Sequence, residues 1–222
     1  MELEEMTAFF TSRLELYDEH MLREVPGCRA GYARMAALLP EGTARLLDLG
    51  CGTGLELEPI FVRFPALKVT GVDLTAAMLD RLRTKFPDRD LTLIRGSYVG
   101  MDFGRTCYDA AVSFETLHHL EPEEKGALYR RVWEALTPEG VYVECDYIAA
   151  TAEEEAALRA EHCRLRMEAG VGGDTLYHFD IPCTLEHQKA LLEAAGFVQV
   201  TAEPLEGDTV LLTARKVTPT GA

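Results

Sequence analysis

The segment LLDLGCGTGLELEP, residues 46–59, restricts what this chain can fold into more than any other part of it. An apolar run ends at Gly50, and Gly52 and Gly54 follow at alternate positions before a helical pattern begins. Glycine lets the backbone turn sharply and approach a ligand with no side chain in between. The segment therefore predicts a buried strand, a tight ligand-binding loop and a helix, in that order.

The residue at the end of the next strand narrows the choice of ligand. Asp73 closes the apolar run 69–72, and a carboxylate there can accept two hydrogen bonds from a ribose diol. The same carboxylate would repel a phosphorylated ribose. A dinucleotide fingerprint would also need glycine at position 55, which is Leu55. A nicotinamide-dependent oxidoreductase is therefore the less favoured alternative.

Apolar runs alternate with helical patterns along most of the chain, and the runs are uniformly apolar. This pattern indicates a parallel sheet that is covered on both faces. We expect an α/β fold with a doubly wound, mostly parallel seven-stranded sheet, an antiparallel C-terminal hairpin and helices on both faces. The expected strands are 46–49, 69–72, 91–94, 110–113 and 141–145, followed by the hairpin strands 197–200 and 210–213.

Two segments lie outside this alternation, and the whole chain, 1–222, is expected to form one domain. Residues 1–40 read as an N-terminal helical cap, and residues 148–183 form an insertion too long for a simple connection. Such insertions after a strand often build a lid or a substrate site. The expected organisation is completed by a cofactor-binding core at 44–147 and by the last helix and hairpin at 184–217.

Composition excludes several classes of partner. The 222 residues carry a formal charge of −15, which repels nucleic acid, and the acidic start of the chain is unlike a secretory signal. No apolar run approaches the roughly 20 residues of a membrane span. The six cysteines show no zinc or redox spacing, so we expect free thiols, no metal and a cytoplasmic location. The oligomeric state stays open.

Four blocks in order resemble the S-adenosylmethionine-dependent methyltransferases with a Rossmann-like fold. They are LLDLGCGTG (46–54), TGVDLTAAML (70–79), YDAAVSFETLHHL (108–120) and LTPEGVYVECDY (136–147). The resemblance implies S-adenosyl-L-methionine as cofactor, with Asp73 on the ribose hydroxyls. Ser97 stands where the family usually offers an acidic residue to adenine. The implied cofactor-binding residues are Asp48, Gly50, Cys51, Gly52, Gly54, Asp73, Leu74, Met78, Ser97, Tyr98 and Phe114.

The segment after the fourth strand points to a small-molecule acceptor. It reads SFETLHHL, and not the Asn/Asp-Pro-Pro-aromatic motif of the family's amide and adenine methylators. Glu115 is either a base or a helix-start residue. On a helix, the adjacent His118 and His119 cannot both face the cleft. The candidate acceptor-side residues are Glu115, His118, Tyr17, Asp146 and His178, and with Asp180 such a Tyr, His and Asp cluster could orient a polar or cationic acceptor.

The expected reaction is an in-line transfer of a methyl group that gives S-adenosylhomocysteine. Such a displacement mainly needs alignment and exclusion of water, so a general base is optional. A non-catalytic adenosyl-binding protein, or one that uses a modified cofactor, is the alternative that the sequence leaves open.

Overall fold

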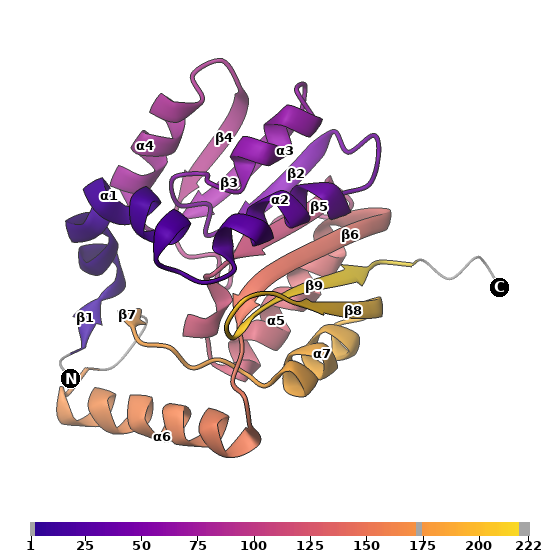
Figure 1. The fold of residues 1–222 in the computed structure, drawn as a ribbon. Coiled ribbons are helices and arrows are strands. Elements are labelled where there is room, and N and C mark those ends of the chain that lie inside the picture. Colours follow the sequence, from indigo (N-terminus) through magenta and orange to yellow (C-terminus); the bar gives the residue numbers. More distant parts are fainter. Residues whose placement is uncertain (1–2, 172–174, 218–222) are drawn as a thin grey trace.

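The computed structural model describes residues 3–171 and 175–217, and its centre is a seven-stranded sheet of order β4-β3-β2-β5-β6-β9-β8 (Figure 1). The first five strands in this order are parallel, whereas β9 runs antiparallel to both β6 and β8. This confirms the predicted sheet and its terminal hairpin. The strands are β2 (Arg45–Leu49), β3 (Lys68–Asp73), β4 (Asp90–Arg95), β5 (Tyr108–Phe114), β6 (Leu136–Tyr147), β8 (Val198–Pro204) and β9 (Thr209–Arg215).

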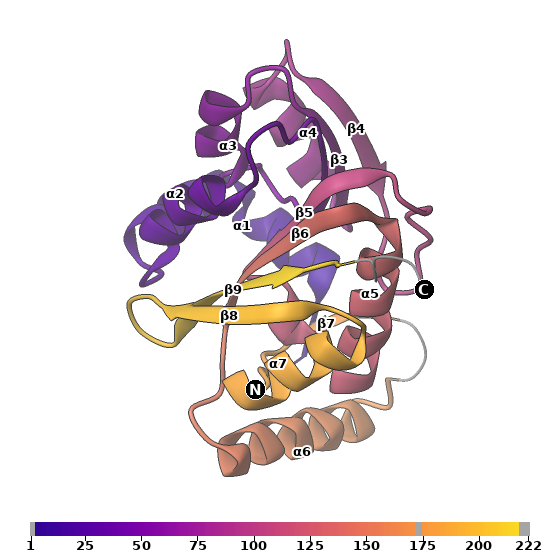
Figure 2. The same ribbon diagram turned by 90° about the vertical axis from the view of Figure 1, so that its right-hand side faces the viewer.

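Helices cover both faces of the sheet, as Figure 2 shows from the side. Buried residues of α2, α3 and α4 pack on one face, and those of α5 and α7 pack on the other. Among the described residues no helix combines the length and the apolar character needed to cross a bilayer. The helices are α1 (Met6–Arg23), α2 (Cys28–Leu38), α3 (Leu57–Arg63), α4 (Ala76–Lys85), α5 (Pro122–Ala135), α6 (Ala152–Glu168) and α7 (Leu185–Ala194).

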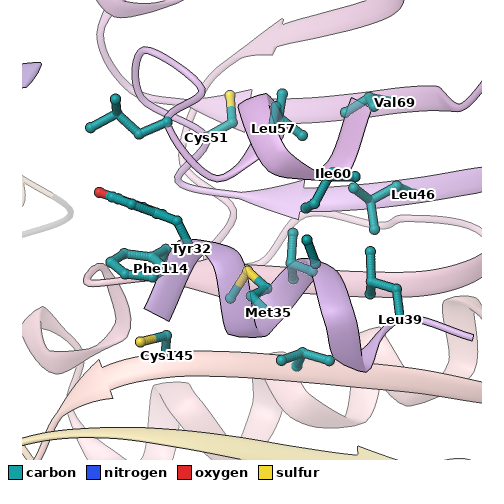
Figure 3. Packing of buried hydrophobic residues seen from close by; sticks show 14 of the residues in the cluster. Tyr32, Met35, Leu39, Leu46, Cys51, Leu57, Ile60, Val69, Phe114 and Cys145 are labelled. Carbon is teal, nitrogen blue, oxygen red and sulfur yellow. The ribbon is translucent and has the colours of Figure 1, made fainter. Parts of the chain in front are cut away.

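The core of the first face is built by α2. Tyr32 and Met35 of this helix, and Leu39 directly after it, project onto the sheet (Figure 3). Met35 is fully buried, and the Tyr32 ring stacks on Phe114 of β5 with centroids 4.0 Å apart. Burial of a side chain of this size contributes about 1.5–3 kcal/mol. The N-terminal segment is thus joined to the cofactor-binding core by a continuous apolar interface.

Three helices begin at residues that satisfy free backbone N–H groups. Pro122 occupies the first position of α5, and the Glu124 carboxylate accepts a hydrogen bond from the Glu121 N–H at 3.1 Å. Thr151 caps α6 and Thr184 caps α7, each through its hydroxyl oxygen. Beside these caps the Ala149 N–H donates to the Cys183 carbonyl at 3.0 Å, so the two ends of the insertion lie side by side.

The N-terminal segment and the insertion meet in a small second sheet. Strand β1 (Glu4–Glu5) pairs antiparallel with β7 (Tyr177–His178), so that Glu5 lies opposite Tyr177 (Figure 1). The Met6 N–H donates to the Leu176 carbonyl at 2.9 Å. We call this pair of strands the clasp. Its position joins two segments that are far apart in the sequence, beside the carboxyl ends of the parallel strands.

Candidate active site

The glycine loop lies where the sequence predicted it, between β2 and α3. Gly50, Gly52 and Gly54 have φ of +68°, +47° and +75°, which disfavours any residue with a side chain. A Cβ at Gly50 would lie 2.4 Å from the Thr116 hydroxyl oxygen, whereas the nearest atom to a Cβ at Gly52 is 3.8 Å away on Tyr17. The loop is therefore packed tightly at Gly50, whereas at Gly52 a Cβ would be in ordinary contact with Tyr17 and the positive φ is what favours glycine.

Asp73 is held at the end of β3 by two backbone donors. Its Oδ2 accepts from the Gly52 N–H at 3.0 Å and its Oδ1 from the Thr75 N–H at 2.7 Å. Burial raises the pKa of this carboxyl above its usual value, and the two N–H groups oppose that rise. A fixed carboxylate with spare lone pairs remains available to hydroxyl donors.

A narrow cavity of about 40 Å³ opens beside Asp73. Leu74 and Tyr98, two of the predicted cofactor residues, line it, and the Tyr98 hydroxyl lies 2.9 Å from the Thr116 hydroxyl. Met6 and Phe10 of α1 close it together with Leu176 from the insertion. We call this space the cofactor cavity. Its walls combine the glycine loop, the end of β3 and the clasp region.

Seven predicted cofactor residues do not line this cavity: Asp48, Cys51, Gly52, Gly54, Met78, Ser97 and Phe114. Cys51 and Met78 are buried, and Phe114 packs against Tyr32 in the core. The Ser97 hydroxyl accepts a hydrogen bond from the Val99 N–H at 3.1 Å and borders a separate hollow. Cys51, Met78 and Phe114 are therefore core residues around the loop and the strands, whereas Ser97 faces a different part of the surface.

Asp48 forms a buried acid pair that the sequence did not reveal. It is 1% exposed, and the Glu56 carboxyl lies beside it, itself 5% exposed. Burial raises the pKa of both groups, that of Glu56 to about 7. Oδ2 of Asp48 and Oε1 of Glu56 have no hydrogen-bond partner in the described chain. Two neighbouring buried carboxyls disfavour ionisation of both groups, so the pair under the glycine loop favours keeping one proton.

A larger cavity of about 620 Å³ lies next to the cofactor cavity. Helix α1 forms one wall, and residues from η1 (Leu117–His119) and from the end of the insertion form the other. We call it the acceptor cavity. Phe10 and His119 belong to both cavities. The residues lining it are Phe9, Phe10, Arg13, Leu16, Tyr17, Glu19, His20, Glu24, Val25, Glu115, His118, His119, His178 and Asp180.

His118 is the centre of a cluster of three carboxyl groups. Its Nδ1 lies 2.6 Å from Asp146 Oδ1 and 3.6 Å from Glu115 Oε2, and its Nε2 lies 3.6 Å from Asp180 Oδ1. These carboxyls outweigh the effect of burial and raise the pKa of His118 to about 9. Asp146 sits beneath the imidazole, 1% exposed, with Oδ2 lacking a hydrogen-bond partner in the described chain.

Glu115 is in an unusual backbone conformation, with φ of +45°, and does not start a helix. Its Oε1 accepts a hydrogen bond from the Thr209 hydroxyl at 3.1 Å. Burial and the neighbouring Asp146 raise the pKa of this carboxyl to about 7, although His118 opposes the rise. The helix-start interpretation is therefore wrong, because α5 begins only at Pro122.

The expectation that only one of the two adjacent histidines faces the cleft is also wrong. His118 and His119 both line the acceptor cavity, with ring centroids 4.1 Å apart. They belong to a short 3-10 turn and not to an α-helix, and Asp180 approaches both rings. His119 Nδ1 is directed at the Phe179 carbonyl, 3.2 Å away, and burial lowers the pKa of this imidazole.

The remaining predicted residues, Tyr17 and His178, lie on the aromatic side of the acceptor cavity. His178 stacks on Phe9 with centroids 3.5 Å apart, and burial lowers its pKa to about 4. Burial also raises the pKa of the Tyr17 hydroxyl. Phe9 and Phe10 complete this wall, although neither was among the predicted site residues.

Three clusters bring possible metal ligands within 4.8 Å of one another. In each cluster some of the possible ligand atoms already take part in hydrogen bonds within the protein. Glu155, for example, accepts from the Thr184 N–H at 2.7 Å and contacts His187 Nδ1 at 2.5 Å. The clusters are His118, His119 and Asp180; Glu155, Cys183 and His187; and Glu115, His118 and Asp146.

Comparison with known proteins agrees with this geometry. A family described as a methyltransferase domain matches residues 46–140. A carboxy-S-adenosyl-L-methionine synthase of Chromohalobacter salexigens is 31% identical over 172 residues, which is 71% of this chain and 63% of that protein. Residues 46–140 form an S-adenosylmethionine-dependent methyltransferase domain. The matches span 63% and 44% of the length of the first two curated relatives.

Solved structures in this family share the fold. One is phosphoethanolamine N-methyltransferase 2 of Haemonchus contortus, which was solved with S-adenosyl-L-methionine. It superposes with a TM-score of 0.72 at 16% sequence identity, and the match includes 96% of this chain and 59% of that enzyme. Another is the 1,6-didemethyltoxoflavin-N1-methyltransferase of Burkholderia thailandensis, which was solved with S-adenosylhomocysteine. Its TM-score is 0.65 at 21% sequence identity, and the match includes 96% of this chain and 88% of that enzyme. The family's cofactor is S-adenosyl-L-methionine, and a loop whose Gly50 and Asp73 both line the cofactor cavity fits its need for close backbone approach.

Proposed function

We propose that this methyltransferase transfers a methyl group from S-adenosyl-L-methionine to a small molecule held in the acceptor cavity. The observation that carries the proposal is that the two cavities meet at Phe10 and His119. One is bounded by the glycine loop and Asp73, and the other by Glu115, His118 and Asp180. Ligands in the two cavities would therefore be neighbours.

The cofactor supplies a methyl carbon already activated by a sulfonium, so the work of the protein is to align the acceptor and exclude water. Alignment can supply at most about 7–11 kcal/mol. Asp73 and the glycine loop hold one ligand, while the rings of Phe9, Phe10 and His178 wall the other. Met6 and Leu176 cover the cofactor cavity and keep solvent away from the junction.

The Glu115–His118–Asp146 group takes up the proton that the acceptor loses. Asp146 fixes the imidazole through Nδ1, and Glu115 lies on the cavity wall beside it. A base is needed only for acceptors that still carry their proton on binding. The arrangement thus suits an N–H or O–H acceptor.

A modified cofactor is the second candidate, because one relative is named as a carboxy-S-adenosyl-L-methionine synthase. A carboxylate on the transferred carbon would lie near Glu115 and Asp180, and like charges there are unfavourable. The acidic acceptor cavity therefore supports plain methyl transfer over this alternative.

The test starts with ligand binding. Thermal unfolding is measured with S-adenosylmethionine, S-adenosylhomocysteine, carboxy-S-adenosylmethionine and NADH. A ligand at 100 times its dissociation constant adds about 2.7 kcal/mol. We expect shifts with the first two ligands and none with NADH. Release of S-adenosylhomocysteine in the presence of a library of small acceptors then tests turnover. Binding without turnover for any acceptor would favour a non-catalytic adenosyl-binding protein.

A further inference from the structure

The acidic and basic side chains around the acceptor cavity do not balance one another at its inner end. We call this end, formed by Glu115, Asp146, Asp180 and the histidines beside them, the floor. At the rim, Arg13 pairs with Glu4 at 3.2 Å, Glu19 pairs with Arg23, and Glu24 contacts His20 at 2.9 Å. At the floor, three carboxyl groups have only histidines as ion-pair partners within residues 3–171 and 175–217. They are Glu115, Asp146 and Asp180.

The histidines at the floor do not cancel this charge. Burial lowers the pKa of His119, and that of His178 to about 4, so both are neutral at pH 7. His118 is the one ring with a raised pKa. One cation therefore faces two to three anions, and unpaired charge is costly at the buried Glu115 and Asp146, whereas the Asp180 side chain is half-exposed.

Two further features direct the missing positive charge to a ligand. Oδ1 of Asp180 and Oδ2 of Asp146 are buried and accept no hydrogen bond from the described chain. The opposite wall carries the rings of Phe10 and Tyr17, whose faces attract cations. The Phe9 ring beside them stacks on His178 and already has the Arg13 guanidinium 3.6 Å from its centroid, so it offers apolar contact only. A ligand that has an apolar body and a cationic nitrogen would satisfy both walls at once.

We infer that the methyl acceptor is an amine that enters as an ammonium or protonated ring nitrogen, with its charge on Glu115 and Asp180 and its apolar part against Phe9, Phe10 and Tyr17. This rests on the proposed function and names its substrate class. The ammonium gives one proton to the Glu115 carboxylate. The freed lone pair bonds to the methyl carbon while the carbon–sulfur bond breaks and its electrons go to sulfur. The product is the N-methylated ammonium.

The inference is tested with matched triads of small ligands on the protein loaded with S-adenosylhomocysteine. Each triad has one apolar frame that ends in an amine, an alcohol or a carboxylate, such as 2-phenylethylamine, 2-phenylethanol and 3-phenylpropionate. Binding is measured by ligand-observed NMR and by calorimetry. We expect the amines to bind at least tenfold more tightly than the alcohols and the carboxylates not to bind.

Three variants test whether the preference for amines comes from the carboxyl groups at the floor of the cavity. E115Q and D180N should each weaken amine binding about tenfold and leave alcohol binding unchanged. E193Q removes one negative charge from the exposed side of α7 and should change neither. Unfolding curves confirm that each variant is folded.

Several results would overturn the inference. These are tighter binding of alcohols or carboxylates, absence of binding by every amine, and an amine preference that survives both E115Q and D180N. Saturable binding of Mn²⁺ or Zn²⁺ that D180N abolishes and amines do not displace would also replace it. In all of these cases, intact binding of S-adenosylmethionine and turnover of a non-amine acceptor would leave the proposed function standing.

Discussion

His118 Nδ1 lies 2.6 Å from Asp146 Oδ1, which joins the turn after β5 to the carboxyl end of β6. Neighbouring parallel strands end at the same edge of a sheet, so two residues far apart in the chain meet there. The contact fixes the imidazole and keeps it charged. It therefore affects stability as well as the proposed chemistry.

D146N should lower the pKa of His118 from about 9 toward its ordinary value. A raised folded-state pKa stabilises the protein fully below about pH 6.5, and this contribution is lost as the pH rises through about 9. We expect D146N to destabilise the protein by about 3 kcal/mol more at pH 6 than at pH 10. Urea unfolding at both pH values and an NMR titration of His118 measure this. Equal losses at the two pH values would contradict it.

Asp73 should control cofactor affinity through its hydroxyl-accepting oxygens. D73N replaces one acceptor oxygen with a donor, and hydrogen bonds to a charged group contribute about 1.5–3 kcal/mol. We expect S-adenosylhomocysteine to bind about 10 to 100 times more weakly by calorimetry. D80N, on the exposed side of α4, is the matched control. Undiminished affinity in folded D73N would show that the ribose lies elsewhere.

The acid pair under the glycine loop should make stability depend on pH. The pKa of Glu56 is raised to about 7, so its contribution is present below about pH 4.5 and lost as the pH rises through 7. E56Q should therefore be more stable than the wild type at pH 8, by at most about 3 kcal/mol, and gain little at pH 5. The exposed E58Q should shift stability by less than about 0.5 kcal/mol at either pH.

Lys125 and Glu144 form a second buried polar group, behind β6. Lys125 is fully buried and donates to Gln188 Oε1 at 3.2 Å, and Gln188 in turn donates to Glu144. K125M should cost about 3–5 kcal/mol because Glu144 is left without a cation. The double variant K125M/E144Q should recover much of this loss in urea unfolding. Simple additivity of the two single changes would refute the interaction.

The sequence predicted the parts of the fold that depend on local patterns. The uniformly apolar runs identified the strands, and the spacing of Gly50, Gly52 and Gly54 identified the loop and the place of Asp73. The length of β6 was underestimated, because it begins at Leu136, directly after α5, and passes through Glu139 at φ of +64°. Positive φ at a residue other than glycine leaves little trace in a sequence.

The parts that escaped prediction depend on contacts between distant segments. Glu4 and Glu5 show no strand pattern and become extended only because Tyr177 and His178 pair with them. The 3-10 turn that brings His119 to Asp180 has no periodicity of its own. The pairing of Asp48 with Glu56 depends on how the glycine loop folds back. These three contacts shape most of the candidate site.

The clasp should control access to the cofactor cavity. Its strands hold Met6 and Leu176 over the space beside Asp73, and that space is too narrow for a nucleoside while they stay in place. Thr53 of the glycine loop also donates to Asp18 of α1 at 2.5 Å, which fixes the helix above the loop. Entry of the cofactor therefore requires β1 and β7 to separate.

A disulfide between β1 and β7 tests this directly. Glu5 and Tyr177 are antiparallel partners, whose Cα atoms lie about 4.5–5.5 Å apart, within the range that a disulfide spans. The variant E5C/Y177C is made with C163S, which removes an exposed thiol. We expect the oxidised form to bind S-adenosylhomocysteine at least tenfold more slowly in stopped-flow measurements, and a reductant to restore the rate. The single variants E5C and Y177C should respond to neither treatment. Equal association rates for the oxidised and reduced forms would mean that the cofactor enters by a route that leaves the clasp closed.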